Sequence, residues 1–421
     1  MNGDHVVVVG AGHAGIHLAG SLRAEGFAGR ITVLGDEPGL PYQRPPLSKD
    51  FLGAGAAPEP LPIRGERFFE SDDVRHLPGS VVTAVDRRAR TVRLADGSVL
   101  TYTDLVLATG ARNRTLDASC GRPAGVHYLR SLAEAGALHR DLEWARRAVV
   151  VGAGFIGLEF ACAARARGLE VTVLEPAQRV LARAVSAPMS THFGHTHRAA
   201  GVDLRLGVGV AAFEQRGGHV TAVVDTAGRA HPADLVLVGI GVVPNTELAV
   251  GAGLAVDDGV VVDERLATSD EHIWAIGDCA SFPHTATGTR VRLESVQNAT
   301  GQAAALARTL TGTPTAYGEV PWFWSVQGRT KLQIAGIAGS SSATVVRGDA
   351  TGGRFSVFRF QQDALAAVES VNSPAEHLAA RLLLANRRPL TPDQAADPAF
   401  DLKAFARQPA TAMAKPGSCA A

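Results

Sequence analysis

Two short segments of the chain are apolar without interruption, and each leads into a glycine-rich turn. The first covers residues 5–9 (HVVVV) and the second residues 148–151 (AVVV). A helix-like stretch and a second apolar run, at 31–34 and 171–174, follow the two turns. Continuous apolar strands are typical of parallel sheets buried on both faces. The pattern therefore predicts two copies of a βαβ unit in one chain.

Segments typical of antiparallel strands follow each unit. Residues 80–93 lead through a turn at Asp96-Gly97 to residues 105–110, and residues 220–225 lead through a turn near Gly228 to residues 234–239. Hairpins inserted into each nucleotide-binding fold explain both segments. Residues 295–310 have the spacing of an amphipathic helix.

A new composition begins at residue 313. Strands are expected around 331–337, 343–347, 355–361 and 364–371, followed by a helix around 374–385. The predicted fold class is α/β, with two Rossmann-like dinucleotide-binding domains in a glutathione-reductase-like arrangement and a C-terminal α+β domain. The Ala/Pro/Gly-rich tail at 407–421 is expected to be flexible.

Charge and cysteine content narrow the class of protein. Among 421 residues, 41 Lys and Arg balance 41 Asp and Glu, so bulk charge does not predict binding to nucleic acid or to a membrane surface. No uncharged apolar run reaches the ~18 residues of a membrane helix. The four cysteines form no C-x-x-C pair, and no basic leader precedes the first strand. We expect a cytoplasmic protein with reduced thiols.

The first glycine turn has the spacing Gly10-x-Gly12-x-x-Gly15 between a strand and a helix. In this motif the first glycine permits the tight turn, the second lets a pyrophosphate approach the backbone, and the third allows close packing of helix and strand. The helix N-terminus offers free N–H groups to the phosphates. The turn, including Ala14, is a predicted cofactor site; the alternative is a tight βα turn without a ligand.

An acidic residue is expected at the end of the second strand of such a unit, where it binds ribose hydroxyls. Asp36 and Glu37 are rivals for this role, because Gly35 shifts the acid one place past the strand end.

The second unit repeats the motif as Gly152-x-Gly154-x-x-Gly157, with Glu175 at the strand end. A carboxylate there binds the adenine ribose 2′-hydroxyl and repels a 2′-phosphate, so NADH is predicted in preference to NADPH. Arg179 and Arg183 lie a few residues further on and leave the strictness of this preference open, as does the possibility that Glu175 only caps the strand.

Two dinucleotide sites in one chain suggest a tightly held flavin and a nicotinamide that reduces it. Thr109-Gly110 and Gly277-Asp278 each form a small-residue turn after an apolar strand, where backbone can approach a cofactor. Asp278 is expected to accept hydrogen bonds from ribityl hydroxyls, or to cap a helix.

Several further stretches together resemble one flavoprotein family. They occur in the family's order and are Pro41–Lys49 (PYQRPPLSK), Leu107–Gly110, Gly241–Asn245 (GVVPN), Ile276–Ala280 (IGDCA), Glu294–Ala299 (ESVQNA) and Pro321–Ser325 (PWFWS). The chain resembles, over about residues 5–400, the NADH-dependent, FAD-containing ferredoxin reductases of oxygenase electron-transfer chains. This family includes putidaredoxin reductase, rubredoxin reductase and the reductase components of dioxygenases.

The resemblance implies roles for individual residues. Lys49 is expected beside the flavin ring, where a cation stabilises the reduced anionic flavin. Glu159 is expected near the nicotinamide, and Trp324 near the flavin, where electrons leave. Further positions implied to bind the cofactors are Arg44, Val82, Arg130, Gly241, Glu294 and Val296. Glu159 has the alternative role of a helix-surface acid, and Trp324 that of a packing residue.

The resemblance implies electron transfer from NADH through FAD to an iron–sulfur ferredoxin, which supplies a haem-thiolate (CYP) monooxygenase or a ring-hydroxylating dioxygenase. The predicted domains are 1–113 with 241–312 for FAD, 114–240 for NADH and 313–406 for the C-terminal domain. The chain has no four-cysteine set for a cluster and no metal spacing among its histidines. It also lacks a redox cysteine pair, which disfavours disulfide reduction.

Alternatives remain for the acceptor and for the class of protein. The acceptor could be rubredoxin, a quinone or oxygen. A nicotinamide-sensing flavoprotein similar to apoptosis-inducing factor is the alternative of a different class. Val326 stands where the family often has an acidic residue, so the partner stays open. Arg290 and Arg292 are candidate contacts for an acidic ferredoxin.

Overall fold

The computed structural model describes residues 3–70, 74–117 and 120–408, which form two compact units. The first unit lies within Met1–Arg183 and Phe193–Glu319, and the second within Ala184–His192 and Val320–Ala421. The predicted flexible tail lies outside the described residues from 409 onward. No helix among the described residues has the length and apolarity needed to cross a membrane.

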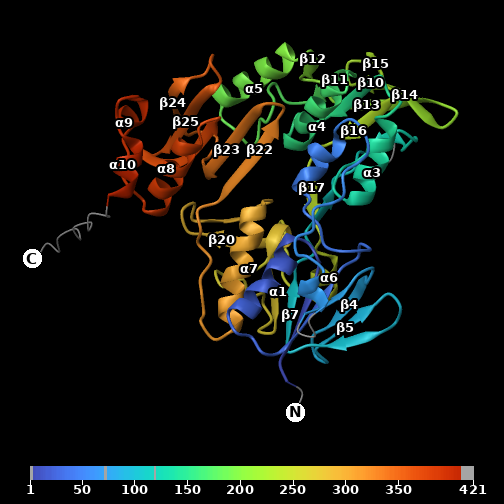
Figure 1. The fold of residues 1–421 in the computed structure, drawn as a ribbon, viewed down its shortest axis with the longest axis vertical. Helices are drawn as coiled ribbons and strands as arrows, with labels where there is room; N and C mark the ends of the chain where they lie inside the picture. The colour runs from blue at the N-terminus through green and yellow to red at the C-terminus, as the bar shows by residue number, and fades with distance from the viewer. Residues whose placement is uncertain (1–2, 71–73, 118–119, 409–421) are drawn as a thin grey trace, which may run out of the picture. The chain divides into compact units, whose positions relative to one another are not determined.

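A five-stranded parallel sheet forms the centre of the first nucleotide fold. Its strand order is β19-β7-β1-β2-β3, with every neighbouring pair parallel. The strands are β1 (His5–Val9), β2 (Arg30–Leu34), β3 (Val74–Leu77), β7 (Asp104–Leu107) and β19 (Ile273–Ala275). Helix α1 (His13–Ala24) follows the glycine turn, and α7 (Val296–Leu310) packs beside it (Figure 1). The predicted βαβ unit and amphipathic helix are both confirmed.

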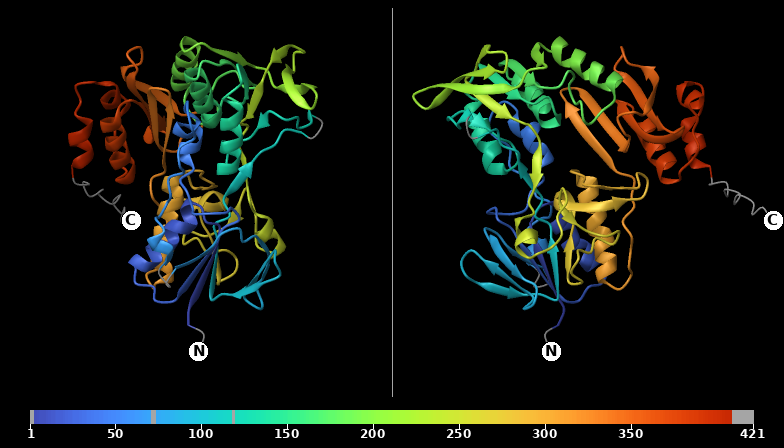
Figure 2. Two further views of the ribbon diagram at one scale, coloured as in Figure 1. Left: turned by 45° about the vertical axis from the view of Figure 1, so that its right-hand side comes forward. Right: turned by 180° about the vertical axis from the view of Figure 1, so that it is seen from behind.

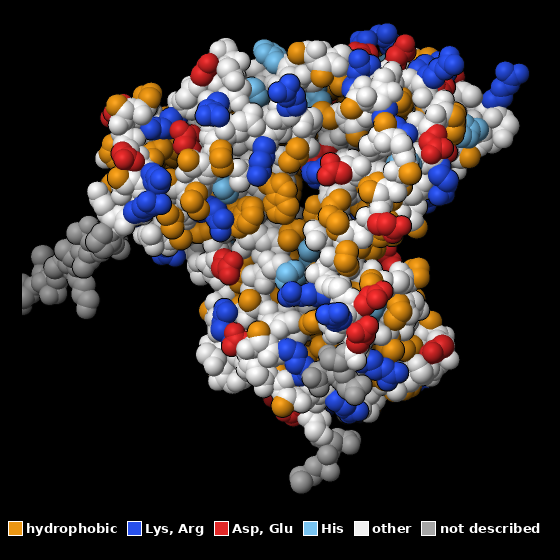
Figure 3. Space-filling view, viewed as in Figure 1, with side chains coloured by type: hydrophobic (Ala, Val, Ile, Leu, Met, Phe, Trp, Pro, Cys, Tyr) orange, Lys and Arg blue, Asp and Glu red, His pale blue; other side chains and the backbone are white. Residues whose placement is uncertain are grey.

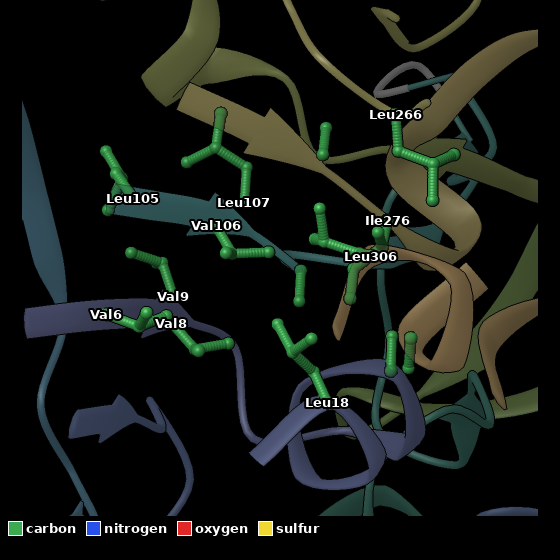
Figure 4. Packing of buried hydrophobic residues seen from close by; sticks show 14 of the residues in the cluster. Val6, Val8, Val9, Leu18, Leu105, Val106, Leu107, Leu266, Ile276 and Leu306 are labelled. Atoms are coloured by element: carbon green, nitrogen blue, oxygen red, sulfur yellow. The ribbon is translucent and has the colours of Figure 1, made fainter. Parts of the chain in front are cut away.

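The core of this fold lies between the sheet and the two helices. Val6 and Val8 of β1 and Leu105 of β7 are fully buried, as are Leu18 of α1 and Leu306 of α7 (Figure 4). Each fully buried aliphatic side chain contributes about 1.5–3 kcal/mol relative to an exposed one. This burial holds the carboxyl ends of β1 and β7 together, and both cofactor turns begin there.

The second nucleotide fold repeats the first. Its parallel sheet has the order β12-β11-β10-β16-β9. The strands are β9 (Val126–His127), β10 (Arg147–Val151), β11 (Glu170–Glu175), β12 (Val202–Leu206) and β16 (Leu235–Val238). The helices are α3 (Leu132–Asp141), α4 (Phe155–Ala166) and α5 (Ala187–Ala199).

Each fold carries an antiparallel insertion, as predicted, but with three strands instead of two. The assignment of residues 105–110 and 234–239 to these hairpins is wrong, because their apolar runs form β7 and β16, which are parallel strands of the central sheets. The insertions are β4 (Val82–Asp86), β5 (Thr91–Leu94) and β6 (Val99–Thr101), and β13 (Val210–Arg216), β14 (His219–Asp225) and β15 (Ala230–Pro232). A two-stranded ribbon of β8 (Ala111–Asn113) and β17 (Val242–Pro244) forms where the chain leaves one nucleotide fold and returns to it. The remaining elements of the first unit are the short η1 (Pro45–Ser48), η2 (Asp50–Leu52), α2 (Arg67–Glu70), α6 (Glu247–Gly251), β18 (Val260–Val261), η4 (Gly277–Cys279), β20 (Ala280–His284) and β21 (Thr289–Val291).

The second unit is an antiparallel sheet with helices on one face (Figure 2). Its strand order is β22-β23-β26-β25-β24. The strands are β22 (Trp322–Gln327), β23 (Thr330–Gly336), β24 (Ala343–Asp349), β25 (Arg354–Gln361) and β26 (Ala364–Val371), and the helices are α8 (Pro374–Ala385), α9 (Pro392–Ala396) and α10 (Leu402–Arg407). The α+β prediction is confirmed; β22 adds a strand at the aromatic cluster.

A buried carboxylate ties residues 184–192 to the sheet of the second unit. The Glu369 side chain is fully buried and accepts hydrogen bonds from the backbone N–H of Ser186 at 2.9 and 3.0 Å and from its hydroxyl at 2.6 Å. Arg359 also pairs with this carboxylate, with its Nη1 3.2 Å from Glu369 Oε1. A buried charge is tolerated only when paired in this way. Segment 184–192 lies between β11 and β12 in the sequence, so no local pattern predicts this contact.

We expect Glu369→Gln to destabilise the second unit by about 2–4 kcal/mol, because Arg359 loses its charged partner inside the fold. The free energy of unfolding in urea measures the loss. Asp363→Asn, in the exposed turn of the same hairpin, is the matched control and should change stability by less than about 0.5 kcal/mol. Equal stability of both variants would contradict the role of Glu369.

Candidate functional site

The first glycine turn has the strained backbone that its motif predicts. Gly10 has φ +117°, and a Cβ there would lie 2.1 Å from the carbonyl oxygen of Ala108. A Cβ on Gly15 would lie 2.0 Å from the carbonyl oxygen of Gly10. Only glycine fits at both positions. The turn therefore brings α1 as close to β1 as backbone packing allows.

Gly12 differs from its two neighbours in the motif, because no atom lies within 4 Å of the place of its Cβ. Gly12 is the N-cap of α1 and no side chain caps the helix. The first N–H groups of α1 therefore face open space, which suits the pyrophosphate of a dinucleotide. Ala14 lies 2.9 Å from the place of a Cβ on Gly277, so both small residues are needed where the two turns meet.

The rival acids Asp36 and Glu37 line one pocket with Gly12. Both oxygens of Glu37 are occupied: Tyr42 donates to Oε2 at 2.5 Å, and Arg44 donates to Oε1 at 2.6 Å. Asp36 is exposed at the rim. Burial raises the pKa of Tyr42, which keeps its hydroxyl a donor. Asp36 is therefore the carboxylate of this pocket that is accessible to a ligand, because Tyr42 and Arg44 already occupy both oxygens of Glu37.

Arg130 connects the 130–134 segment to the turn after β19. Its Nη2 lies 2.7 Å from Asp278 Oδ2, and its Nε donates to the carbonyl of Ala111 at 3.0 Å. Arg44 donates to the carbonyl of Arg130 at 2.7 Å. The alternative of Asp278 as a helix cap is wrong, because this short turn has no side-chain cap. Three predicted cofactor residues, Arg44, Arg130 and Asp278, therefore form one network.

The Thr109-Gly110 turn is held by Asn245, which comes from the GVVPN stretch. The Thr109 hydroxyl donates to the Asn245 carbonyl at 2.7 Å, and the Asn245 amide donates to the Thr109 carbonyl at 2.8 Å. Gly110 has φ +65°, a conformation that glycine adopts at little cost. The Asn245 contacts fix the backbone of this turn at the carboxyl end of β7.

The second glycine turn repeats the first. Gly152 has φ +101°, a Cβ on Gly157 would lie 2.1 Å from the Gly152 carbonyl oxygen, and Gly154 is an N-cap without a side-chain cap. Glu175 accepts hydrogen bonds from the N–H groups of Ala153 at 2.7 Å and Ala177 at 2.9 Å. Glu175 thus supports the turn, and its binding of a ribose stays a prediction.

A buried ion pair joins the two nucleotide folds. The Lys49 Nζ lies 2.7 Å from Glu159 Oε2, and the Ser48 hydroxyl donates to the same oxygen at 2.5 Å. The side chain of Glu159 is 2% exposed and that of Lys49 is 20% exposed. Glu159 is therefore not a helix-surface acid. The two residues predicted beside the flavin and the nicotinamide touch each other, although they come from different folds.

The described cysteines are suited to packing and not to thiol chemistry. Cys120, Cys162 and Cys279 are free. Burial, with a smaller effect of Glu159, raises the pKa of Cys162 to about 11, and burial raises the pKa of Cys279. Neither forms a thiolate readily at neutral pH. Among the residues that the structure describes, no group of three His, Cys, Asp or Glu could hold a metal ion.

The remaining predicted site residues of the first unit lie at turns and element ends. Val82 begins β4 and packs against the core of the first fold. Gly241, with φ +104°, precedes β17, and Val296 begins α7. Glu294 is exposed and pairs with Arg292 at 2.7 Å.

The two candidate docking arginines have internal partners. Arg292 is only 9% exposed and pairs with both Asp258 and Glu294. The guanidinium of Arg290 donates to the carbonyls of Val262 and Ser281. Arg292 is therefore engaged by two carboxylates, whereas Arg290 is exposed and bonds only to neutral carbonyls, so its contact with a ferredoxin stays a prediction. On the face shown in Figure 3, acidic and basic side chains are interspersed, in keeping with the zero net charge.

Trp324 lies in the second unit, on β22. Its ring packs against that of Trp322 with centroids 5.5 Å apart and the planes tilted by 33°, and Arg381 lies 4.7 Å from the centre of the Trp322 ring. His377 meets the Trp322 ring edge to face at 5.9 Å. The predicted position of Trp324 beside the flavin stays a prediction.

Several residues of the site carry no motif signal of their own. Ser48 and Tyr42 lie inside the PYQRPPLSK stretch, so the resemblance marked the region but not these side chains. Glu134 accepts from the N–H groups of Arg130 and Ser131 at 2.9 Å each and starts α3 with a capping box. The S-x-x-E spacing at 131–134 is the signal that could have found it. His13, the first residue of α1, carries no sequence signal, because its position in the glycine motif accepts any residue.

The site fits two dinucleotides. Each fold presents an uncapped helix N-terminus, a glycine that leaves its backbone open, and a carboxylate at the end of the next strand. The side chains expected beside the reacting rings meet between them. Fold and site thus define an oxidoreductase with two dinucleotide sites and no reactive cysteine pair among its described residues.

Comparison with known protein families supports the assignment as an oxidoreductase. The family model described as pyridine nucleotide-disulphide oxidoreductase matches residues 4–303, and the model described as reductase C-terminal matches residues 322–406. The chain therefore belongs to the pyridine nucleotide-disulphide oxidoreductase family. It is an FAD-dependent oxidoreductase that uses NAD(H), as predicted.

Individual relatives match almost the whole chain. Rhodocoxin reductase of Rhodococcus erythropolis is 50% identical over 398 residues, which cover 94% of this chain and 93% of that protein. The crystal structure of the ferredoxin reductase for the CYP199A2 system of Rhodopseudomonas palustris matches with a TM-score of 0.93 and 46% identity, over 96% of this chain and 100% of that one. The reductase in the covalent putidaredoxin reductase–putidaredoxin complex matches with a TM-score of 0.92 and 41% identity, over 96% and 98%. The family resemblance predicted from the sequence is confirmed.

Proposed function

We propose that this protein is a ferredoxin–NAD+ reductase that passes electrons from NADH through FAD to an iron–sulfur ferredoxin. The ferredoxin in turn supplies an oxygenase, either a haem-thiolate monooxygenase or a ring-hydroxylating dioxygenase. The observation that carries the proposal is the Lys49–Glu159 pair at 2.7 Å, where one residue from each dinucleotide fold meets the other. Relatives of full length that are named as reductases of small redox proteins support it.

A bound FAD would supply the hydride acceptor for NADH and the one-electron chemistry that a ferredoxin needs. The protein's residues position the two cofactors and set the local charge. The N-termini of α1 and α4 bind the pyrophosphates, and Asp36 and Glu175 bind the ribose hydroxyls. Lys49 holds a positive charge where negative charge increases on reduction, and Glu159 with Ser48 fixes the direction of that side chain.

The absence of a redox cysteine pair among the described residues supports electron transfer to a separate protein. We assign the FAD-binding domain to residues 1–113 and 241–312, the NADH-binding domain to 114–240, and the C-terminal domain to 313–406. Trp324 is our candidate for the route by which electrons leave. We place the protein in the cytoplasm, where NADH and reduced ferredoxins occur together.

An anaerobic titration followed by visible absorbance tests the proposal. About one equivalent of NADH should bleach the yellow protein, and NADPH should do so only weakly. A purified [2Fe–2S] ferredoxin, a rubredoxin and a soluble quinone are then compared as acceptors. Fast turnover with the ferredoxin supports the proposal. Faster turnover with rubredoxin or the quinone would instead identify that compound as the acceptor. Slow reduction and a long-lived complex that resists air would favour the nicotinamide sensor.

Coenzyme choice depends on the charge of Glu175. We expect Glu175→Gln to erode the preference for NADH over NADPH about tenfold, because a neutral amide no longer repels the 2′-phosphate. The glutamine retains an acceptor for the N–H of Ala153 or Ala177, so the turn is kept. The ratio of kcat/KM for the two coenzymes measures the effect. Glu175→Ala should also weaken the binding of NADH. An unchanged ratio of kcat/KM for NADH and NADPH in both variants would contradict this role of Glu175.

A further inference from the structure

His13 occupies a position in the first glycine turn that the dinucleotide motif leaves variable. It is the first residue of α1, directly after the open Gly12. Its ring is half-buried and stacks on that of His17 one helical turn later, with centroids 6.4 Å apart and planes 8° from parallel. The charged groups that act on it come from three other segments and are Arg44, Arg130 and Asp278. These are residues of the cofactor network already described.

Arg44, Arg130, Asp278 and His17 together define where His13 lies. Arg44 follows β2, Arg130 precedes α3, and Asp278 follows β19. His13 is the first residue of α1, directly after Gly12, which lines one pocket with Asp36 and Arg44, so it stands at the helix end that opens toward these groups. Because no side chain caps α1, a ring N–H at this first position adds a donor to those of the backbone. The pyrophosphate is the part of oxidised FAD that carries negative charge at neutral pH, and it is the group expected at this helix N-terminus.

We propose that His13 is a ligand of the FAD pyrophosphate and that its protonation couples FAD binding to pH. The proposal rests on the FAD site described above. A neutral imidazole offers one donor to a phosphate oxygen, whereas the imidazolium offers a charge-assisted hydrogen bond as well. The ring therefore binds the same anion weakly at high pH and more strongly at low pH.

The surroundings of His13 make this coupling strong. Burial, followed by the charges of His17 and Arg44, lowers the pKa of His13 to about 4, and Asp278 opposes them. A pyrophosphate brings two negative charges, and an opposite charge at this distance raises a histidine pKa by about 1–3 units. FAD binding then takes up a proton, so FAD affinity must increase as the pH falls.

The expected size follows from linkage. A rise of about two units in the pKa of His13 makes FAD bind about tenfold more tightly at pH 5 than at pH 7.5. His17 is the rival group, because burial and Arg64 lower its pKa as well. Variants of both histidines are therefore needed to assign the coupling.

The test measures FAD release from the purified holoprotein, without turnover. Free flavin fluorescence is followed after dilution at pH values between 7.5 and 5, with circular dichroism as a check of folding. Wild type should show the tenfold change in dissociation constant. His13→Gln, which keeps a neutral donor, should bind FAD within about threefold of wild type at pH 7.5 and show no pH dependence. His17→Gln should keep the wild-type slope.

Three results would overturn the proposal: a flat profile in wild type, an unchanged slope in His13→Gln, or loss of the slope in His17→Gln. His13→Ala provides a second variant. It should weaken the binding of FAD at pH 7.5 as well, because it removes the hydrogen-bond donor. A wild-type protein that holds no FAD at any pH would instead contradict the proposed function and not the role of His13 alone.

Discussion

Replacing Gly12 by alanine should give a folded protein that binds FAD at least about 100-fold more weakly. Gly12 has φ −79°, which alanine adopts without strain, and its Cβ would meet no atom within 4 Å. The methyl group would instead fill the space through which a pyrophosphate reaches the N–H groups of α1. Loss of two charge-assisted hydrogen bonds at about 1.5 kcal/mol each corresponds to that factor. The ratio of flavin to protein absorbance measures it.

Gly154→Ala is the matched control in the second fold, where the nearest atom to a Cβ is the Gly239 carbonyl oxygen at 3.9 Å. This variant should retain FAD and require a much higher NADH concentration for reduction. Gly10→Ala should behave differently from both, because its Cβ would clash with Ala108 and disturb folding. Full FAD content in Gly12→Ala, or loss of FAD from Gly154→Ala, would show that the two folds have been assigned wrongly.

Lys49→Met should slow the reduction of the flavin by NADH about 100-fold and destabilise the protein by about 3 kcal/mol. The rate falls because a cation no longer stabilises the charge that increases on the flavin, an effect of about 2.7–4 kcal/mol for a preorganised donor. Stability falls because the carboxylate of Glu159, 2% exposed, loses the cation that balances its charge. Stopped-flow absorbance and urea unfolding measure the two effects separately. Lys403→Met, on an exposed residue of α10, is the control.

The double variant Lys49→Met/Glu159→Gln separates the two roles. Removing both charges should restore most of the stability, because no buried charge is left without a partner. The reduction rate should stay low, since the cation is still missing. If Lys49→Met loses stability but reduces at the wild-type rate, Lys49 only joins the two folds and does not act on the flavin.

Local sequence patterns predicted the elements to which we assign the binding of the cofactors. The glycine spacings at 10–15 and 152–157, the apolar strands before them and the acids after them specify their structure within about 30 residues. The reason is that a βα turn is built from neighbouring residues, and only glycine fits where backbone approaches backbone. The resemblance added Lys49, Arg130 and Trp324, whose roles no spacing suggests.

Interactions between distant residues were decided only by the tertiary structure. Lys49 and Glu159 are 110 positions apart and Arg130 and Asp278 are 148 apart, yet each pair lies at 2.7 Å. Such pairs form when separate sheets and helices pack, so neither periodicity nor a motif specifies them. The same holds for Ser186, which Glu369 binds across 183 positions.

The sequence by itself thus determined that the chain contains two dinucleotide folds and a third domain, because each is encoded by local patterns. The tertiary structure decided which charged side chains pair with each other and are therefore not available to a ligand or a partner. In the folded chain Glu37 bonds to Tyr42 and Arg44, Arg292 pairs with Asp258 and Glu294, and His13 comes under the electrostatic influence of Arg44, Arg130 and Asp278. Charged side chains are long and find partners according to the final packing, and a one-dimensional pattern does not contain that information.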